Sequence, residues 1–153
     1  MTPGQQIGRK PSKPLFVALV AITFVGPLSI HLFLPALPFV RQAFDVDQST
    51  AQLTYSLAML VMAFATLVYG SVSDRLGRLP VLLFGLVLFT IGATLSVTAS
   101  NITILLIGRV LQGAGAACGV VLARAMVSDV YGADRLGKMI AYLTVAYVIG
   151  PLT

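Results

Sequence analysis

Asp74, Arg75 and Arg78 place three of the chain's fifteen charged residues (ten Lys or Arg and five Asp) within five positions. Gly70 and Gly77 flank Asp74, and the whole segment stands between two long apolar stretches. Glycine permits a tight turn, and a carboxylate beside two guanidinium groups offers an acceptor and several donors for ionic hydrogen bonds. A simple turn does not need these residues in this order. The segment is therefore a candidate functional site.

A second candidate site lies within an apolar stretch, where Arg109 is followed by Gln112 and Gly113. An arginine inside a membrane is costly unless it faces a cavity or a partner. Gln112 shares a helix face with Arg109, so both can present polar groups to one cavity. The alternative is that Arg109 extends its side chain to the membrane surface. Further along, Gly115 and Gly119 form a four-residue spacing of small residues at which another helix can approach.

His31 is the chain's one histidine and lies in the first apolar stretch. An imidazole titrates near neutrality, so a membrane histidine that faces water can carry a proton. The alternative is a neutral histidine that is hydrogen-bonded to a helix neighbour. Pro27, Pro35 and Pro38 each remove a helix hydrogen bond, which predicts that this stretch is bent near the outer membrane surface.

The composition indicates a multi-spanning membrane protein. Mean hydropathy is +0.95, 58% of residues are hydrophobic and glutamate is absent from the sequence. About 20 apolar residues cross a bilayer as a helix, whereas barrel strands are shorter and alternate in polarity. The sequence therefore predicts an all-α transmembrane protein with a tail at 1–13, four complete spans and part of a fifth. The predicted spans are Pro14–Val40, Ala51–Tyr69, Leu79–Ala99, Ile102–Val127 and Met139–Thr153.

The basic residues predict the orientation of these spans. Arg41, with Asp45 and Asp47 nearby, is the one basic residue in the connections on the outer side. The seven on the other side are Arg9, Lys10, Lys13, Arg75, Arg78, Arg135 and Lys138. The positive-inside rule thus places the amino terminus in the cytoplasm. The net charge of +5 then reflects topology and contact with anionic lipid heads, and we expect no nucleic-acid partner.

Other classes of site find little support. Cys118, the one cysteine, lies within the fourth predicted span, so neither a disulfide within the chain nor a zinc site is expected. One histidine and one cysteine also provide no nucleophile and base pair, so we expect no enzyme. The sequence stops inside the fifth apolar stretch, from which we expect a fragment of a longer protein.

Three motifs together resemble the major facilitator superfamily. The Gly70–Arg78 segment resembles its motif A, which lies in the cytoplasmic connection between spans two and three. The Arg109–Gly115 segment resembles motif B in span four, and Gly150 and Pro151 resemble the start of motif C of the antiporters in span five. Segments Pro27–Pro38 and Arg124–Asp129 are similar to the bicyclomycin-resistance branch of drug:proton antiporters.

This resemblance implies a twelve-span carrier in a bacterial inner membrane, of which the chain would form most of the amino-terminal half. Such a carrier exports drugs by alternating access, uses the proton gradient rather than a cofactor, and takes its substrate between two halves. We expect its partners to be small molecules, protons, the lipid bilayer and the missing carboxy-terminal half, and the complete protein to be a monomer.

The resemblance also assigns roles. Asp74 would accept hydrogen bonds from amides at the start of a helix in the other half and so hold the outward-open state. Arg78 would pair with Asp129, and Arg109 would take part in proton coupling with His31 as a titrating partner.

Two departures from the family pattern stand beside these roles. Leu79 replaces a basic residue in motif A, and His31 replaces an acidic residue that is common in span one. A facilitator without proton coupling and a non-transporting membrane sensor are therefore the alternatives.

Overall fold

A computed structural model describes residues 13–131, 137–138 and 140–141 of the chain. Gly150, Pro151 and most of the fifth predicted span lie outside these residues, as does the tail up to residue 12. Within the described residues every regular element is a helix, which confirms the all-α prediction. The elements are α1 (Lys13–His31), the short 3-10 helix η1 (Leu34–Ala36), α2 (Leu37–Phe44), α3 (Gln48–Leu76), α4 (Arg78–Val97) and α5 (Ile102–Tyr131).

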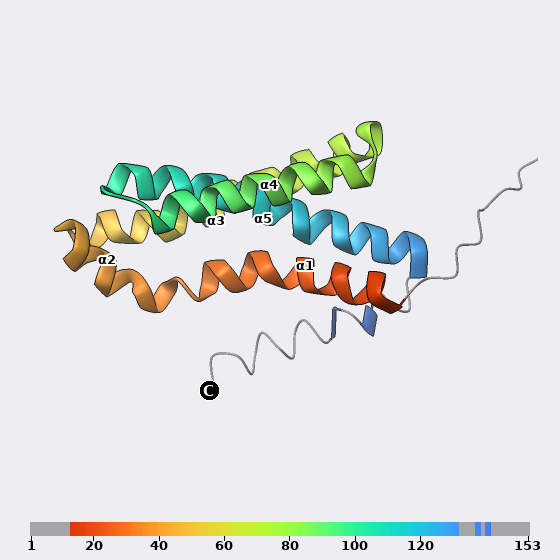
Figure 1. Ribbon diagram of the computed structural model, residues 1–153, viewed down its shortest axis with the longest axis horizontal. Coiled ribbons are helices and arrows are strands. Elements are labelled where there is room, and N and C mark those ends of the chain that lie inside the picture. The colour runs from red at the N-terminus through yellow and green to blue at the C-terminus, as the bar shows by residue number, and fades with distance from the viewer. Residues whose placement is uncertain (1–12, 132–136, 139, 142–153) are drawn as a thin grey trace, which may run out of the picture.

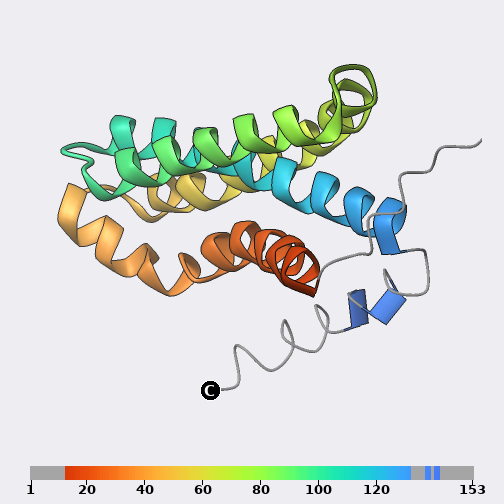
Figure 2. The ribbon, with the colours of Figure 1, turned by 45° about the vertical axis from the view of Figure 1, so that its right-hand side comes forward.

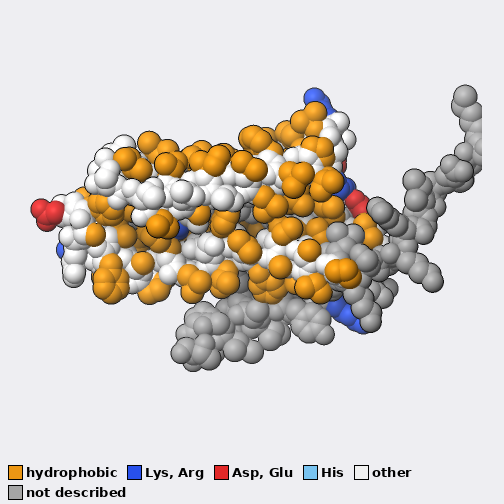
Figure 3. Space-filling view, in the orientation of Figure 1, with side chains coloured by type: hydrophobic (Ala, Val, Ile, Leu, Met, Phe, Trp, Pro, Cys, Tyr) orange, Lys and Arg blue, Asp and Glu red, His pale blue; other side chains and the backbone are white. Residues whose placement is uncertain are grey.

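The helices form an elongated antiparallel bundle with charges at its two ends. Four stretches of it are long and apolar enough to cross a membrane, namely 17–44, 48–76, 78–97 and 102–130. The start of α1, the α3–α4 connection and the end of α5 meet at one end of the bundle (Figure 1). Hydrophobic side chains cover the visible face of the bundle between its two ends (Figure 3). Most of the visible charged atoms lie at the two ends. The bundle therefore matches the layered polarity of a bilayer.

The first span is interrupted rather than only bent. Helix α1 accommodates Pro27 but ends at His31, and the chain resumes as η1 and then α2. Pro35 and Pro38 stand at the starts of these two elements, where a missing amide hydrogen breaks no established hydrogen bond. The helix is broken at Leu32 and Phe33, immediately before this pair of prolines.

Helix α3 is longer than the predicted span, and this corrects the expected turn at Gly70–Arg78. The carboxylate of Asp47 caps its start by accepting a hydrogen bond from the Thr50 amide at 3.3 Å, and hydrogen bonding by Thr50 lowers the pKa of Asp47. The helix then continues past Tyr69, where the predicted span ended, to Leu76, because the sequence has no proline there to stop it. The turn itself consists of Gly77, whose φ of 90° suits glycine.

Helix α5 is the centre of the bundle. In an apolar part of 18 residues within its membrane-length stretch 56% of residues are buried, compared with 17–22% in the corresponding parts of the other three. It lies between α1 on one side and α4 on the other in both ribbon views (Figure 1 and Figure 2). Backbone contact at glycines brings α4 close. A Cβ at Gly92 would lie 2.7 Å from the Gly108 carbonyl oxygen, and one at Gly115 would lie 2.5 Å from that of Gly85.

Small residues also bring α1 and α3 against α5. Gly119 faces Ile22 of α1, whereas Gly115 faces α4, so the two glycines do not form the single face that their spacing predicted. The backbone of Ala58 of α3 stands against Gly113. Helices in lipid gain little from burying apolar surface, so this close approach is what brings the packing energy.

We predict that Gly92→Ala destabilises the bundle by about 1–3 kcal/mol, because its methyl group has no space beside Gln112 and Gly108. Gly70→Ala is the matched control, since a Cβ at Gly70 would meet no atom within 4 Å. Replacing a helical glycine there should leave stability unchanged or raise it by about 0.5–1 kcal/mol. Thermal unfolding of the purified protein in detergent, followed by circular dichroism, measures both changes. Equal effects of the two substitutions would contradict the packing account.

Candidate functional site

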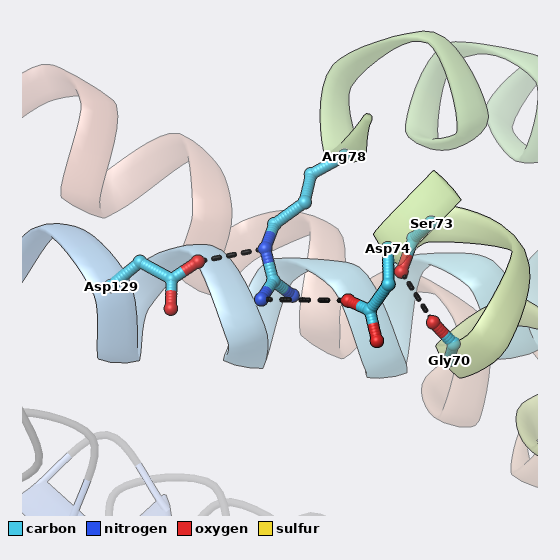
Figure 4. A network of polar contacts seen from close by, with 5 residues as sticks. All are labelled: Gly70, Ser73, Asp74, Arg78 and Asp129. Atoms are coloured by element: carbon cyan, nitrogen blue, oxygen red, sulfur yellow. Dashed lines mark hydrogen bonds and ion pairs between the residues drawn. The ribbon is translucent and has the colours of Figure 1, made fainter. Parts of the chain in front are cut away.

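The structure contains two polar clusters, one at an end of the bundle and one in its interior. The end cluster comprises Gly70, Ser73, Asp74, Arg78 and Asp129 (Figure 4). It joins the end of α3, the start of α4 and the last turn of α5. All five positions fall on the side where the sequence places most basic residues.

The strongest contact of the end cluster is an ion pair between helices. Nε of Arg78 lies 2.7 Å from Oδ2 of Asp129, which confirms the pairing that the sequence analysis expected. Arg78 begins α4 and Asp129 nearly ends α5. Each charge taken alone is unfavourable at that end of its helix, so their pairing offsets both dipole interactions.

Asp74 makes a weaker contact. Its carboxylate lies 4.0 Å from Nη2 of Arg78, and 72% of its side chain is exposed. Arg75 is exposed beside it. Gly70 lies within α3, where its carbonyl accepts a hydrogen bond from the Ser73 hydroxyl at 2.9 Å. A Cβ at Gly70 would meet no atom of the described residues within 4 Å. The contact of Asp74 with another half of a carrier stays a prediction.

The interior cluster consists of Arg109, Gln112 and Phe33. The Arg109 side chain is 3% exposed, so it does not extend to the surface as the alternative required. Its Nη1 donates a hydrogen bond to Oε1 of Gln112 at 2.6 Å, which agrees with the predicted shared face. The Phe33 ring covers the guanidinium, with 3.9 Å between Cζ and the ring centre. Such stacking stabilises a desolvated cation by about 2 kcal/mol.

The guanidinium of Arg109 is only partly satisfied. Its Nε and Nη2 are buried and have no hydrogen-bond partner among the described residues. A buried donor without an acceptor costs about 1–3 kcal/mol, and more when it is charged. No acidic residue stands near Arg109 along α5, because the sequence contains none between Asp74 and Asp129. Arg109 is thus a buried cation with two hydrogen-bond donors, Nε and Nη2, that have no acceptor among the described residues.

His31 and Gly113, the other two predicted members of this site, both contact helix α3. The ring of His31 meets that of Tyr55 edge to face, with 6.4 Å between ring centres. Gly113 is a packing residue at the α3 contact. Sequence reasoning missed Phe33, one of eight phenylalanines, because its contact with Arg109 on another helix depends on how the helices pack.

The sequence of the chain was compared with known protein families, proteins and solved structures. The family model described as Major Facilitator Superfamily matches residues 19–153. The chain belongs to the major facilitator superfamily. No solved structure matches it significantly.

Several curated relatives of this superfamily chain carry transporter names. Multidrug resistance protein D of Escherichia coli K12 is 30% identical over 90% of the chain and 35% of its own length. Multidrug resistance protein MdtL of Escherichia coli O139:H28 is 38% identical over 80% of the chain and 32% of its own length. The uncharacterized MFS-type transporter YdgK of Bacillus subtilis is 33% identical over 86% of the chain and 33% of its own length. The chain thus spans about a third of the length of these relatives.

We predict an energetic coupling between Arg78 and Asp129. Both side chains are partly exposed, at 33% and 53%, so the coupling should be about 0.5 kcal/mol and should decrease at high salt. A double-mutant cycle with Arg78→Gln and Asp129→Asn, read by unfolding in detergent, measures it. The same cycle with Arg75→Gln in place of Arg78→Gln is the control and should be additive. Additivity in both cycles would mean that the ion pair adds no stability.

Proposed function

We propose that the full-length protein carrying this chain is a secondary transporter that exports drugs or other small amphipathic compounds. The match to the superfamily over residues 19–153, in register with four membrane-length stretches, is the observation that carries the proposal. The multidrug-resistance names of two relatives support the substrate class. Transport proceeds by alternating access in a bacterial inner membrane and is driven by protons.

The distribution of charge supports a cytoplasmic amino terminus. Arg75 and Arg78 stand at the α3–α4 end of the bundle, on the side where α1 begins. The opposite end has Arg41 together with the acidic Asp45 and Asp47. Basic residues are retained on the cytoplasmic side of bacterial inner membranes.

In this proposal the end cluster acts as a conformational latch. Arg78 and Asp129 hold α4 to α5, while the exposed carboxylate of Asp74 remains able to contact a second body. Its hydrogen bonds to amides of a helix in the other half stabilise one of the two alternating states. A difference of a few kcal/mol between the states is enough for such control.

In the same proposal the interior cluster, together with His31, couples transport to the movement of protons. His31 is the group that gains and loses a proton, and Arg109 is a fixed positive charge. His31 lies two residues before Phe33, whose ring covers Arg109.

We predict that Asp74→Asn abolishes most of the transport while membrane insertion is unchanged, because a neutral amide is a weaker acceptor for helix amides. Accumulation of a fluorescent amphipathic dye in cells that express the full-length protein measures the effect. Asp45→Asn is the matched control, since Asp45 is an exposed carboxylate at the other end and asparagine tolerates its φ of 49°. Normal export by Asp74→Asn would contradict the latch.

Arg109→Ala should abolish the part of dye export that an uncoupler inhibits. The same accumulation assay, with and without uncoupler, measures this part, and membrane levels of the variant provide the control. Proton-linked export that survives Arg109→Ala would show that Arg109 has no part in coupling. If the unmodified protein left accumulation unchanged, the sensor alternative would be favoured over export.

A further inference from the structure

We propose that the free edge of Arg109 binds a carboxylate of the transported compound, so that the protein selects amphipathic anions over cations. This inference rests on the proposed export function and names its substrate class. It starts from two contacts of the Arg109 side chain and from the two nitrogens that these contacts leave over. Gln112 occupies Nη1, Phe33 occupies one face of the guanidinium plane, and the buried Nε and Nη2 have no partner within the described residues.

The two unpartnered nitrogens form one chemical unit. Nε–H and the neighbouring N–H of Nη2 point the same way along one edge of the guanidinium. This edge is the side-on fork that binds both oxygens of a carboxylate in parallel. A neutral amide can use the fork only with a single oxygen, and an ammonium group cannot use it at all. The edge therefore recognises a planar anion by shape as well as by charge.

The charge around the fork favours the same class of compound. The membrane-length stretches contain five arginines, of which Arg109 and Arg124 lie on α5, and Nε of Arg124 is also buried and unpartnered within the described part. Their acidic residues, Asp74 and Asp129, lie at the end of the bundle beside Arg78. In a low-dielectric interior an unneutralised cation repels a second cation strongly and attracts an anion. Among the described residues of these helices, a cationic drug would find carboxylates only at the end of the bundle, where Asp74 and Asp129 lie beside Arg78.

Phe33 is one of the side chains that enclose the guanidinium. In the described conformation Arg109 is 3% exposed, so a compound reaches the fork only after neighbouring side chains move, and the Phe33 ring lies directly over the guanidinium plane. The ring belongs to the interruption between α1 and η1, where Phe33 N bonds to the Ile30 carbonyl at a long 3.3 Å. Such interruptions are where broken transporter helices flex around a substrate. An anionic substrate also suits export, because an interior-negative membrane potential drives anions outward.

Three matched probes test the proposal on the purified full-length protein: 1-naphthoate, 1-naphthamide and 1-naphthylmethylammonium. Isothermal titration calorimetry should find 1-naphthoate bound at least about tenfold more tightly than 1-naphthamide, the size expected for a desolvated ionic hydrogen bond. In Arg109→Gln this preference should disappear while 1-naphthamide binding is unchanged. Arg109→Lys should keep only part of it, because lysine retains the charge without the fork. Arg124→Gln is the control and should keep the preference.

The wild-type comparison decides even if a variant fails to fold. Equal binding of the three probes, binding of none, or a preference for 1-naphthylmethylammonium overturns the proposal, as does a preference for 1-naphthoate that survives in Arg109→Gln. Proteoliposome transport separates this inference from the proposed function. If 1-naphthoate binds through Arg109 but is not transported, export is wrong and the site stands. If 1-naphthylmethylammonium is transported independently of Arg109, export stands and the site is wrong.

Discussion

The contact of glycine backbones along α5 is the constraint on which the rest of the structure depends. Inside a bilayer, apolar surface gives helices little reason to associate, so they must gain energy from close packing. Gly92 and Gly108 let α4 reach the α5 backbone, and Gly113 does the same for α3. These contacts make α5 the most buried helix of the bundle. Many side chains of α5, Arg109 among them, therefore point at another helix and not at lipid.

This packing determines what becomes of Arg109. A guanidinium on a lipid-facing helix would extend to the membrane surface, whereas on α5 it is enclosed between its own helix and the interrupted first span. Phe33 and Gln112 compensate part of the cost, but the Nε and Nη2 donors remain unsatisfied among the described residues. A buried charge that is only partly compensated is a place where another acceptor gains much by binding. We therefore propose different tasks for the two clusters, substrate binding and proton coupling for the interior cluster and control of conformation for the end cluster.

Much of this arrangement could be predicted from the sequence where it depends on local spacing. The apolar stretches predicted the membrane helices, and the separation of Arg109 and Gln112 by three residues predicted their hydrogen bond. The pairing of Arg78 with Asp129 came instead from the resemblance to the superfamily. The rest depends on how helices pack. Helical structure beyond Tyr69 was missed because hydropathy falls at Gly70 although nothing there stops a helix.

The partners of individual residues across helices were the least predictable feature. The contact between Gly92 and Gly108 can be predicted only when the relative register of α4 and α5 is known, and a single sequence does not reveal this register. For the same reason Phe33, one of eight phenylalanines, could not be recognised as the ring over Arg109. The Gly115 and Gly119 pair shows the opposite error, since a familiar spacing predicted one face where the structure has two.

An experimental structure of the full-length protein with bound 1-naphthoate would show what satisfies the buried guanidinium. The account predicts that the two carboxylate oxygens lie about 2.7–2.9 Å from Nε and Nη2 of Arg109, the spacing of ionic hydrogen bonds, with Phe33 moved from its present position. A structure in which a carboxylate or carbonyl group of the protein itself occupies both nitrogens, with 1-naphthoate elsewhere or absent, would contradict it.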